Sequence, residues 1–229
     1  MVKNLTYQIV DMRIRKTGMF CRGGFHPKPN DKIPISGQTC IMVGNAGRQF
    51  WSEFETGKSD EVNPLEHWTS SVLGVAAEEF GAEVLFPFTG PPYLPFLTWA
   101  QRSELVFPSP IGLLIHPQFG LWHAYRGMLV FNDLIKLPPK ISSTHHPCKT
   151  CDDKPCTTTC PVDALRDGGF LPKVCTGHIR SQFGRNCMEK GCLARRACPI
   201  GRPYIYQPNQ ARFHMASFLE TFGETCNSN

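Results

Sequence analysis

From His146 to Pro161 the chain reads HPCKTCDDKPCTTTCP, which places four cysteines within 13 residues. Four more cysteines follow, the first at Cys175 and the last at Cys198. Eight of the 11 cysteines therefore lie in one stretch of 51 residues. A proline directly follows both Cys160 and Cys198. Such a density of thiols points to a cysteine-bound inorganic site.

Two four-iron clusters account best for these thiols, because each such cluster takes four thiolates. In two-cluster ferredoxins the cysteine before proline ligates the cluster other than the one its own run binds. That rule divides the eight cysteines into two quartets. The first quartet is Cys148, Cys151, Cys156 and Cys198. The second quartet is Cys160, Cys175, Cys187 and Cys192. The first run departs from the usual C-x2-C-x2-C-x3-C-P spacing, since four residues separate Cys151 from Cys156.

Zinc and disulfides are the alternative explanations for these cysteines. Zinc sites favour separate cysteine pairs, whereas the first run packs four thiols together. Disulfides need an oxidising compartment, and the N-terminal residues MVKNLTYQIVDMRIRK lack the apolar segment of a signal peptide. We therefore expect a cytoplasmic protein. The three other cysteines, Cys21, Cys40 and Cys226, are expected to be ordinary thiols.

The composition is that of a globular chain, with 41% hydrophobic residues and a mean hydropathy of −0.23. No run of about 18 apolar residues is present, so we expect no membrane partner. The formal net charge is +5. Two oxidised clusters with their thiolates would contribute about −4 in total, and bound metal charge belongs in such a sum. The charge balance therefore gives no reason to expect a nucleic-acid partner.

The first 140 residues read as a mixture of helices and strands. Thr39–Val43 is expected to be a buried strand that turns at Gly44–Gly47, with a short helix at 48–54. Asn63, Pro64 and Gly81 mark the ends of a longer helix. Its expected apolar face is Leu65, Trp68, Val72, Val75, Ala76 and Phe80. Further strands are expected at 83–88, 111–115 and 127–131, and an apolar stripe from Ala211 to Phe222 predicts a final helix.

Between Ile111 and Gly127 the chain reads IGLLIHPQFGLWHAYRG, which resembles the I-H-P-x-F-G-x-W-x-A-x-R-G stretch of CblC-type cobalamin-processing proteins. Nine positions between Ile115 and Gly127 match, and Leu137-Pro-Pro139 also has a counterpart there. The resemblance implies cobalamin as a ligand. The candidate cofactor-binding residues are His116, Phe119, Trp122 and Arg126. Each has a structural alternative: a loop hydrogen bond for the histidine, core packing for the two aromatic residues, and a core polar contact for the arginine.

A front domain of this kind followed by a cysteine module resembles epoxyqueuosine reductases and reductive dehalogenases. The resemblance implies an α/β (α+β) fold, with a nitroreductase-like cobalamin domain and a C-terminal bacterial-ferredoxin-like module that holds two clusters. The expected domains are 1–140 for cobalamin, 141–206 for the clusters, and 207–229 for a C-terminal helix that packs back on the first domain. In those enzymes the clusters pass electrons to cobalt.

The sequence thus predicts an oxidoreductase-like protein that reduces cobalamin or removes its upper ligand. We also considered a cobalamin-dependent reductase of a separate organic substrate, a plain electron-transfer ferredoxin, and a flavin protein that binds FMN. No residue stands out as a catalytic proton donor. The expected partners are cobalamin and a low-potential electron donor, such as a ferredoxin or flavodoxin reductase system. A homodimer would suit nitroreductase relatives.

Overall fold

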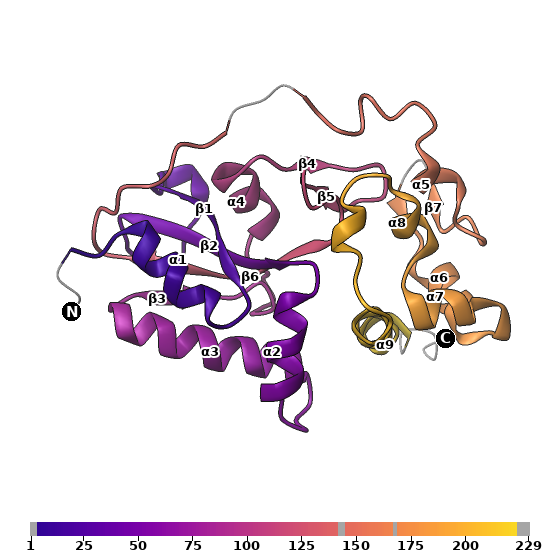
Figure 1. The fold of residues 1–229 in the computed structure, drawn as a ribbon, viewed down its shortest axis with the longest axis horizontal. Helices are drawn as coiled ribbons and strands as arrows, with labels where there is room; N and C mark the ends of the chain where they lie inside the picture. The colour runs from indigo at the N-terminus through magenta and orange to yellow at the C-terminus, as the bar shows by residue number, and fades with distance from the viewer. Residues whose placement is uncertain (1–3, 142–144, 167–168, 224–229) are drawn as a thin grey trace. The chain divides into compact units, whose positions relative to one another are not determined.

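Figure 1 shows a computed structural model of the chain, which describes residues 4–141, 145–166 and 169–223. The described residues fall into two compact units. The first unit comprises Met1–Val106 and His123–Ser143, and the second comprises Phe107–Trp122 and Thr144–Asn229. Each unit is described by itself below.

The first unit is built on an antiparallel sheet with the strand order β1-β2-β6-β3. Its strands are β1 (Phe20–Phe25), β2 (Thr39–Ala46), β3 (Glu83–Leu85) and β6 (His123–Phe131). The two central strands pair from Thr39 opposite Phe131 to Ala46 opposite His123. Every residue from Thr39 to Asn45 is buried, so both faces of β2 are covered. The predicted buried strand is confirmed, but it continues through Gly44 and Asn45, where a turn was expected.

Four helices belong to the first unit: α1 (Tyr7–Arg15), α2 (Gln49–Gly57), α3 (Pro64–Phe80) and α4 (Phe96–Ser103). In Figure 1, α3 lies below the sheet and α4 lies above it. The aromatic rings of Phe50 and Phe54 on α2 meet the ring of Trp68 on α3 edge to face, with centroids 5.5 and 5.9 Å apart. These contacts fix the α2–α3 pair against the sheet by burial of large apolar side chains.

The ends of α3 are those the sequence predicts. Asn63 occupies the N-cap in a left-handed conformation, although its side chain makes no capping hydrogen bond, and Pro64 is the first helical residue. Gly81 ends the helix at φ 66°, where glycine avoids the strain that a side chain would suffer. The predicted apolar face was partly wrong: Leu73 and Ala77 are buried, whereas Val75 is 50% exposed. Apolar residues lie on both sides of the predicted apolar face, so their spacing alone does not predict which side of α3 faces the core.

The second unit contains short elements joined by loops. Its strands form two hairpins, β4 (Phe107–Pro108) with β5 (Leu114–Ile115), and β7 (Leu165–Arg166) with β8 (Gly169–Phe170). Its helices are α5 (Pro155–Thr158), α6 (Pro172–Arg180), α7 (Arg185–Lys190), α8 (Leu193–Ala197) and α9 (Pro208–Gly223). Helix α9 packs against α6 and α7, so the predicted final helix is present. The expected strand at 111–115 is shorter than predicted.

The fold is therefore a mixed α/β structure with an antiparallel sheet, in agreement with the coarse expectation. The compact units divide the chain differently from the predicted domains, because residues 107–122 belong with the cysteine-rich part. The ferredoxin-like character of that part and the packing of the last helix on the first domain stay predictions. Among the described residues, no helix combines the length and the apolar character needed to cross a bilayer.

Candidate functional site

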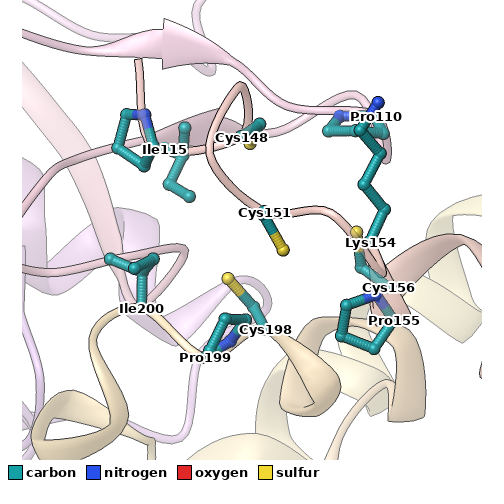
Figure 2. Close-up of a pocket in the computed structure, with 11 residues that line it drawn as sticks. Pro110, Ile115, Cys148, Cys151, Lys154, Pro155, Cys156, Cys198, Pro199 and Ile200 are labelled. Atoms are coloured by element: carbon teal, nitrogen blue, oxygen red, sulfur yellow. The ribbon is translucent and has the colours of Figure 1, made fainter. Parts of the chain in front are cut away.

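The four cysteines of the first quartet line one pocket in the second unit. Cys156 lies on α5, Cys198 is the C-cap of α8, and Cys148 and Cys151 come from the loop before α5. In Figure 2 the sulfur atoms of Cys151 and Cys198 point toward one another across this pocket. The remaining lining residues are mostly apolar: Pro110, Ile115, Pro147, Lys154, Pro155, Pro199 and Ile200.

The thiols of the first quartet influence one another electrostatically. Burial raises the pKa of Cys148, and the neighbouring thiols of Cys198, Cys156 and Cys151 raise it further. Burial likewise raises the pKa of Cys156, again with contributions from Cys198 and Cys151. Thiolates held this close repel one another unless positive charge lies between them. A metal cluster supplies such charge, so this donor set suits one.

The second quartet gathers in the same way from three helices and a loop. Cys175 lies on α6, Cys187 lies on α7, Cys192 is the N-cap of α8, and Cys160 follows α5. Burial raises the pKa of Cys175 to about 12, and Cys192, Cys160 and Cys187 contribute in that order. The structure thus brings together the same two sets of four cysteines that the Cys-Pro rule selects. Their binding of clusters stays a prediction.

Helix α8 connects the two quartets, because Cys192 is its N-cap and Cys198 is its C-cap. Backbone N–H groups point at sulfur in both sets: the amide of Leu193 bonds to Cys187, and that of Ile200 bonds to Cys198. The amide of Ala164 donates to the sulfur of Cys160 at 3.3 Å. Amide–sulfur hydrogen bonds lower the pKa of thiols and, in iron–sulfur proteins, help to set the reduction potential.

Among the residues that the structure describes, no three His, Cys, Asp or Glu side chains converge in a way that could hold a single metal ion. A zinc site places its thiolates at about 2.3 Å from one atom. In a four-iron cluster each thiolate binds a different iron atom, so convergence on one point is not required.

The segment that carries the I-H-P-x-F-G-x-W motif packs directly on the first quartet. Ile111, Ile115 and Leu121 share an apolar core with Cys156 and Cys198. At Gly120 the chain approaches the segment after Cys198 so closely that a Cβ atom would lie 2.0 Å from the carbonyl oxygen of Ile200. Gly120 also has a φ of +58°, which favours glycine over any other residue. This close approach could not be read from the sequence, since its two sides are 80 residues apart.

His116 holds the turn of this motif together. Its Nδ1 atom accepts hydrogen bonds from the backbone N–H groups of Gln118 at 3.0 Å and Phe119 at 3.2 Å. Its ring stacks on that of Phe119, with centroids 4.3 Å apart, and Phe119 meets Tyr204 edge to face. His116, Phe119 and Tyr204 are half-buried. The three rings form a partly exposed aromatic surface that suits contact with a flat cofactor.

Trp122 and Arg126, the other two candidate cofactor residues, are engaged in contacts within their own units. Trp122 is 1% exposed, meets Tyr206 edge to face at 5.2 Å, and carries the guanidinium of Arg195 over its ring at 4.5 Å. Its buried indole N–H has no hydrogen-bond partner among the described residues. Arg126 donates to Asn45 at 2.9 Å and lies over the ring of Phe50. These contacts fit structural roles, and a cofactor role for either residue stays a prediction.

His146, Cys21 and Cys40 also have structural surroundings. The Nδ1 atom of His146 accepts from the amide of Cys148 at 3.2 Å, and its ring stacks on Phe107. Cys21 and Cys40 are buried thiols of the first unit, as expected. Cys226 lies outside the described residues. Tyr204 and Tyr206 were not singled out from the sequence, although both follow the second Cys-Pro step closely.

Comparison with solved structures places the fold among a small set of proteins. An epoxyqueuosine reductase from Streptococcus thermophilus has a TM-score of 0.54 at 16% identity, over 94% of this chain and 75% of that one. An epoxyqueuosine reductase solved with an epoxyqueuosine-modified tRNA stem loop has a TM-score of 0.51 at 13% identity, over 95% and 76%. The B12-trafficking protein CblC of C. elegans has a TM-score of 0.53 at 15% identity, over 94% and 92%.

At these identities the likeness shows the fold and not the activity. It supports the mixed α/β fold with an antiparallel sheet, whereas the C-terminal ferredoxin-like module stays a prediction. No family model matches the chain, and a search of curated proteins finds no match. The tRNA stem loop belongs to one of the compared proteins, so our expectation of no nucleic-acid partner for this chain stays a prediction.

Proposed function

We propose that this chain holds two four-iron clusters, one in each quartet, and acts as a reductase in the handling of cobalamin. The observation that carries the proposal is the shared apolar core of the motif segment and the first quartet, in which Ile115 and Leu121 pack with Cys156 and Cys198. A segment that resembles a cobalamin-protein motif is therefore packed against four gathered thiols. When bound, the clusters would supply electrons at low potential, since four-iron clusters can reach about −400 mV or lower.

The residues of the chain have separate tasks in this proposal. The eight cysteines hold the clusters, and the apolar residues around the first quartet limit the access of water. The amides of Leu193 and Ile200 stabilise thiolate charge at Cys187 and Cys198. The half-exposed rings of His116 and Phe119 would contact the flat face of cobalamin.

Cobalamin is the substrate in this proposal. One electron is added to a Co(III) cobalamin that carries cyanide or water as its upper ligand. The ligand then leaves with its bonding electron pair, and Co(II) cobalamin remains. A cobalamin-dependent reductase of a separate organic substrate would use the same electron path. The sequence identifies no catalytic proton donor that would favour this second function.

The first test is the metal content of anaerobically purified protein. We expect about eight iron and eight acid-labile sulfide atoms per chain. Cys198→Ser and Cys187→Ser should each lose about half of this iron, because each removes one ligand of a different quartet. Cys40→Ser, at a buried thiol outside both quartets, should keep all of it. Protein without iron or sulfide would contradict the proposal.

The second test is the absorbance of hydroxocobalamin and cyanocobalamin mixed with the iron-loaded protein and dithionite. We expect conversion to Co(II) cobalamin faster than dithionite alone achieves. His116→Ala should weaken cobalamin binding, whereas His116→Asn retains a side-chain acceptor for the two loop amides and separates a loop effect from a ring effect. An iron-loaded protein that leaves the cobalamin spectrum unchanged would instead be an electron carrier, and a yellow protein that releases FMN would be a flavin enzyme.

A further inference from the structure

The two quartets differ in the charge of the chain around them. Residues 145–166, which hold most of the first quartet, contain three Lys or Arg residues and three Asp residues. Residues 169–200, which hold most of the second quartet, contain six Lys or Arg residues and one Glu. Two bound clusters would carry the same charge, so the need to neutralise a cluster does not explain the difference. The excess of positive charge around the second quartet therefore calls for another explanation.

Much of this positive charge is carried by solvent-exposed residues of α6 and α7. Lys173 and Arg180 are exposed residues of α6, and Arg185 is the exposed first residue of α7. Between them, Val174 is 40% exposed, and Phe183 is 80% exposed in the 3-10 turn Gln182–Gly184. A large aromatic side chain exposed to this extent beside basic residues is typical of protein interaction surfaces.

Gly177 is an exposed residue in the middle of α6. A glycine inside a helix costs stability relative to alanine. Nothing among the described residues requires it here, because a Cβ atom at Gly177 would meet none of their atoms within 4 Å, and its φ is not left-handed. Glycine does allow another backbone to approach a helix closely. An outside partner that packs on α6 would give a reason for this residue.

The same helix carries a cysteine of the second quartet. Cys175 is half-buried, one residue from exposed Val174 and two residues from exposed Gly177. Thr176 and Ile179 are buried and hold the opposite side of the helix against the unit. A protein bound to the exposed side would therefore be separated from Cys175 by little more than the thickness of one helix.

We propose that the surface formed by Lys173, Val174, Gly177, Arg180, Phe183 and Arg185, termed the α6 face, docks a small acidic electron-carrier protein. The inference rests on the proposed function above and names its electron entry point, the second quartet. One electron leaves the reduced donor and is gained at that quartet, with no bond formed or broken and no proton transferred. Opposite charges would steer the encounter, and a contact centred on Val174, Gly177 and Phe183 would exclude water.

The experiment uses iron-loaded protein and an acidic flavodoxin as the probe, under anaerobic conditions. Flavodoxin binding is measured directly, and electron transfer is followed by the appearance of the blue one-electron-oxidised flavin. Lys173→Glu should weaken binding about tenfold at low ionic strength, and the difference should shrink as salt screens the charges. Lys136→Glu, which makes the same change at an exposed lysine of the first unit, should bind like the unchanged protein.

Alanine substitutions at Gly177 and at Gly74 give a test in which weaker binding cannot be caused by loss of folding. Gly177→Ala should raise the melting temperature and yet weaken flavodoxin binding, because the added methyl group obstructs a close approach. Gly74→Ala, at a mid-helix glycine of α3 where a Cβ likewise meets nothing within 4 Å, should raise the melting temperature without any effect on binding. Equal binding by both alanine variants and by Lys173→Glu would overturn the proposal.

Two further outcomes separate this proposal from others. Reduction of the α6-face variants by dithionite should equal that of the unchanged protein, since dithionite needs no docking. Failure of every protein to be reduced by dithionite would count against the proposed function, whereas normal dithionite reduction with unaltered flavodoxin transfer would count against the docking site alone. If the variants lose affinity for an RNA stem loop and keep flavodoxin binding, the face binds nucleic acid and the proposal is wrong.

Discussion

The carbonyl oxygen of Leu121 accepts two hydrogen bonds from the guanidinium of Arg195, from Nε at 3.1 Å and from a terminal nitrogen at 2.5 Å. The same guanidinium lies near the rings of both Trp122 and Tyr206, at 4.5 and 4.7 Å from their centroids. Arg195 belongs to α8, the helix that connects the two quartets. Arg195 therefore holds the end of the motif segment against α8, whose two caps are a cysteine of the second quartet and a cysteine of the first.

Replacement of Arg195 by methionine should destabilise the second unit by about 2–3 kcal/mol. The change removes charge-assisted hydrogen bonds and two cation–π contacts, while much of the apolar stem is kept. The stability of Arg195→Lys should lie between that of the unchanged protein and that of Arg195→Met, since lysine keeps the charge but not the planar guanidinium. The measurement is thermal unfolding of anaerobic protein, followed by tryptophan fluorescence.

Arg185→Met is the control for Arg195, because Arg185 is exposed and pairs with the carboxylate of Glu189 on the protein surface. Its melting temperature should stay close to that of the unchanged protein. Equal melting temperatures for Arg195→Met and Arg185→Met would show that the Arg195 contacts do not hold the motif segment.

Gly120→Ala should cost about 2 kcal/mol more than Gly112→Ala. Both glycines have positive φ values, +58° and +79°, so both substitutions introduce similar backbone strain. Only at Gly120 would the new Cβ also meet an atom, the carbonyl oxygen of Ile200 at 2.0 Å, whereas at Gly112 it meets nothing within 4 Å. Thermal unfolding measures the two costs.

The iron content of the same two variants tests the link to the first quartet. Because Ile200 follows Cys198 by two residues, a shift of this contact should also disturb that quartet. Gly120→Ala is expected to drop toward about four iron atoms per chain, while Gly112→Ala keeps about eight. Equal iron contents in Gly120→Ala and Gly112→Ala would show that the contact of the motif segment with Ile200 does not affect the cluster site.

The parts of the fold that the sequence predicted are those with strong local patterns. The long helix α3 has a proline at its start and a glycine at its end, and β2 is a continuous apolar run. Strand β1 was missed because it contains Gly23 and Gly24 and a register shift between Cys21 and Gly24, which leave no alternation to read. The membership of residues 107–122 in the second unit depends on contacts with α8 and the Cys-Pro segment, which no local pattern encodes.

The candidate site was predictable to the extent that ligand chemistry dictates it. Four-iron clusters require four thiolates each, and the Cys-Pro rule predicts the quartet whose cysteines line one pocket, whereas the assignment of ligands to clusters stays a prediction. The surroundings of Trp122 and Arg126 were not predictable, because the residues that occupy their side chains are distant in sequence. Tyr206 lies 84 residues after Trp122, and Asn45 lies 81 residues before Arg126.

Glu104→Gln should destabilise the first unit by about 3–5 kcal/mol, because it leaves a buried arginine without its countercharge. The side chain of Arg22 is 0% exposed and lies 2.5 Å from the Glu104 carboxylate, which also accepts a hydrogen bond from the Tyr125 hydroxyl at 2.5 Å. Chemical denaturation of the anaerobic protein measures the cost.

Two variants serve as controls for the buried pair. Glu79→Gln removes the carboxylate from an exposed pair with Arg13 and should change stability little. The double variant Arg22→Met with Glu104→Leu should recover much of the loss, because no buried charge is then left unpaired. A single Glu104→Gln variant as stable as Glu79→Gln would show that the pair is not buried in solution.

Stability should fall in alkaline solution, and Cys40 should account for part of the fall. Burial raises the pKa of this thiol from 9.0 to about 12, with a further increase from the Asp31 carboxylate and an opposing effect of Arg102. The unfolded chain thus releases the Cys40 proton near pH 9, whereas the folded chain keeps it until about pH 12. The contribution of Cys40 to the free energy of unfolding is complete below pH 9 and is lost progressively up to pH 12. A difference of three pKa units corresponds to about 4 kcal/mol at most.

Cys40→Val removes this titrating group and should flatten the dependence of the unfolding free energy on pH between 9 and 12. Val43→Ala, at another fully buried position of β2, should lower stability at every pH but keep the slope of the unchanged protein. The comparison is one of slopes and not of absolute values, because Tyr7 and Cys21 also have raised pKa values and act in the same direction in every variant. If Cys40→Val and Val43→Ala have the same slope, the Cys40 thiol is accessible to water in solution and does not link folding to proton release.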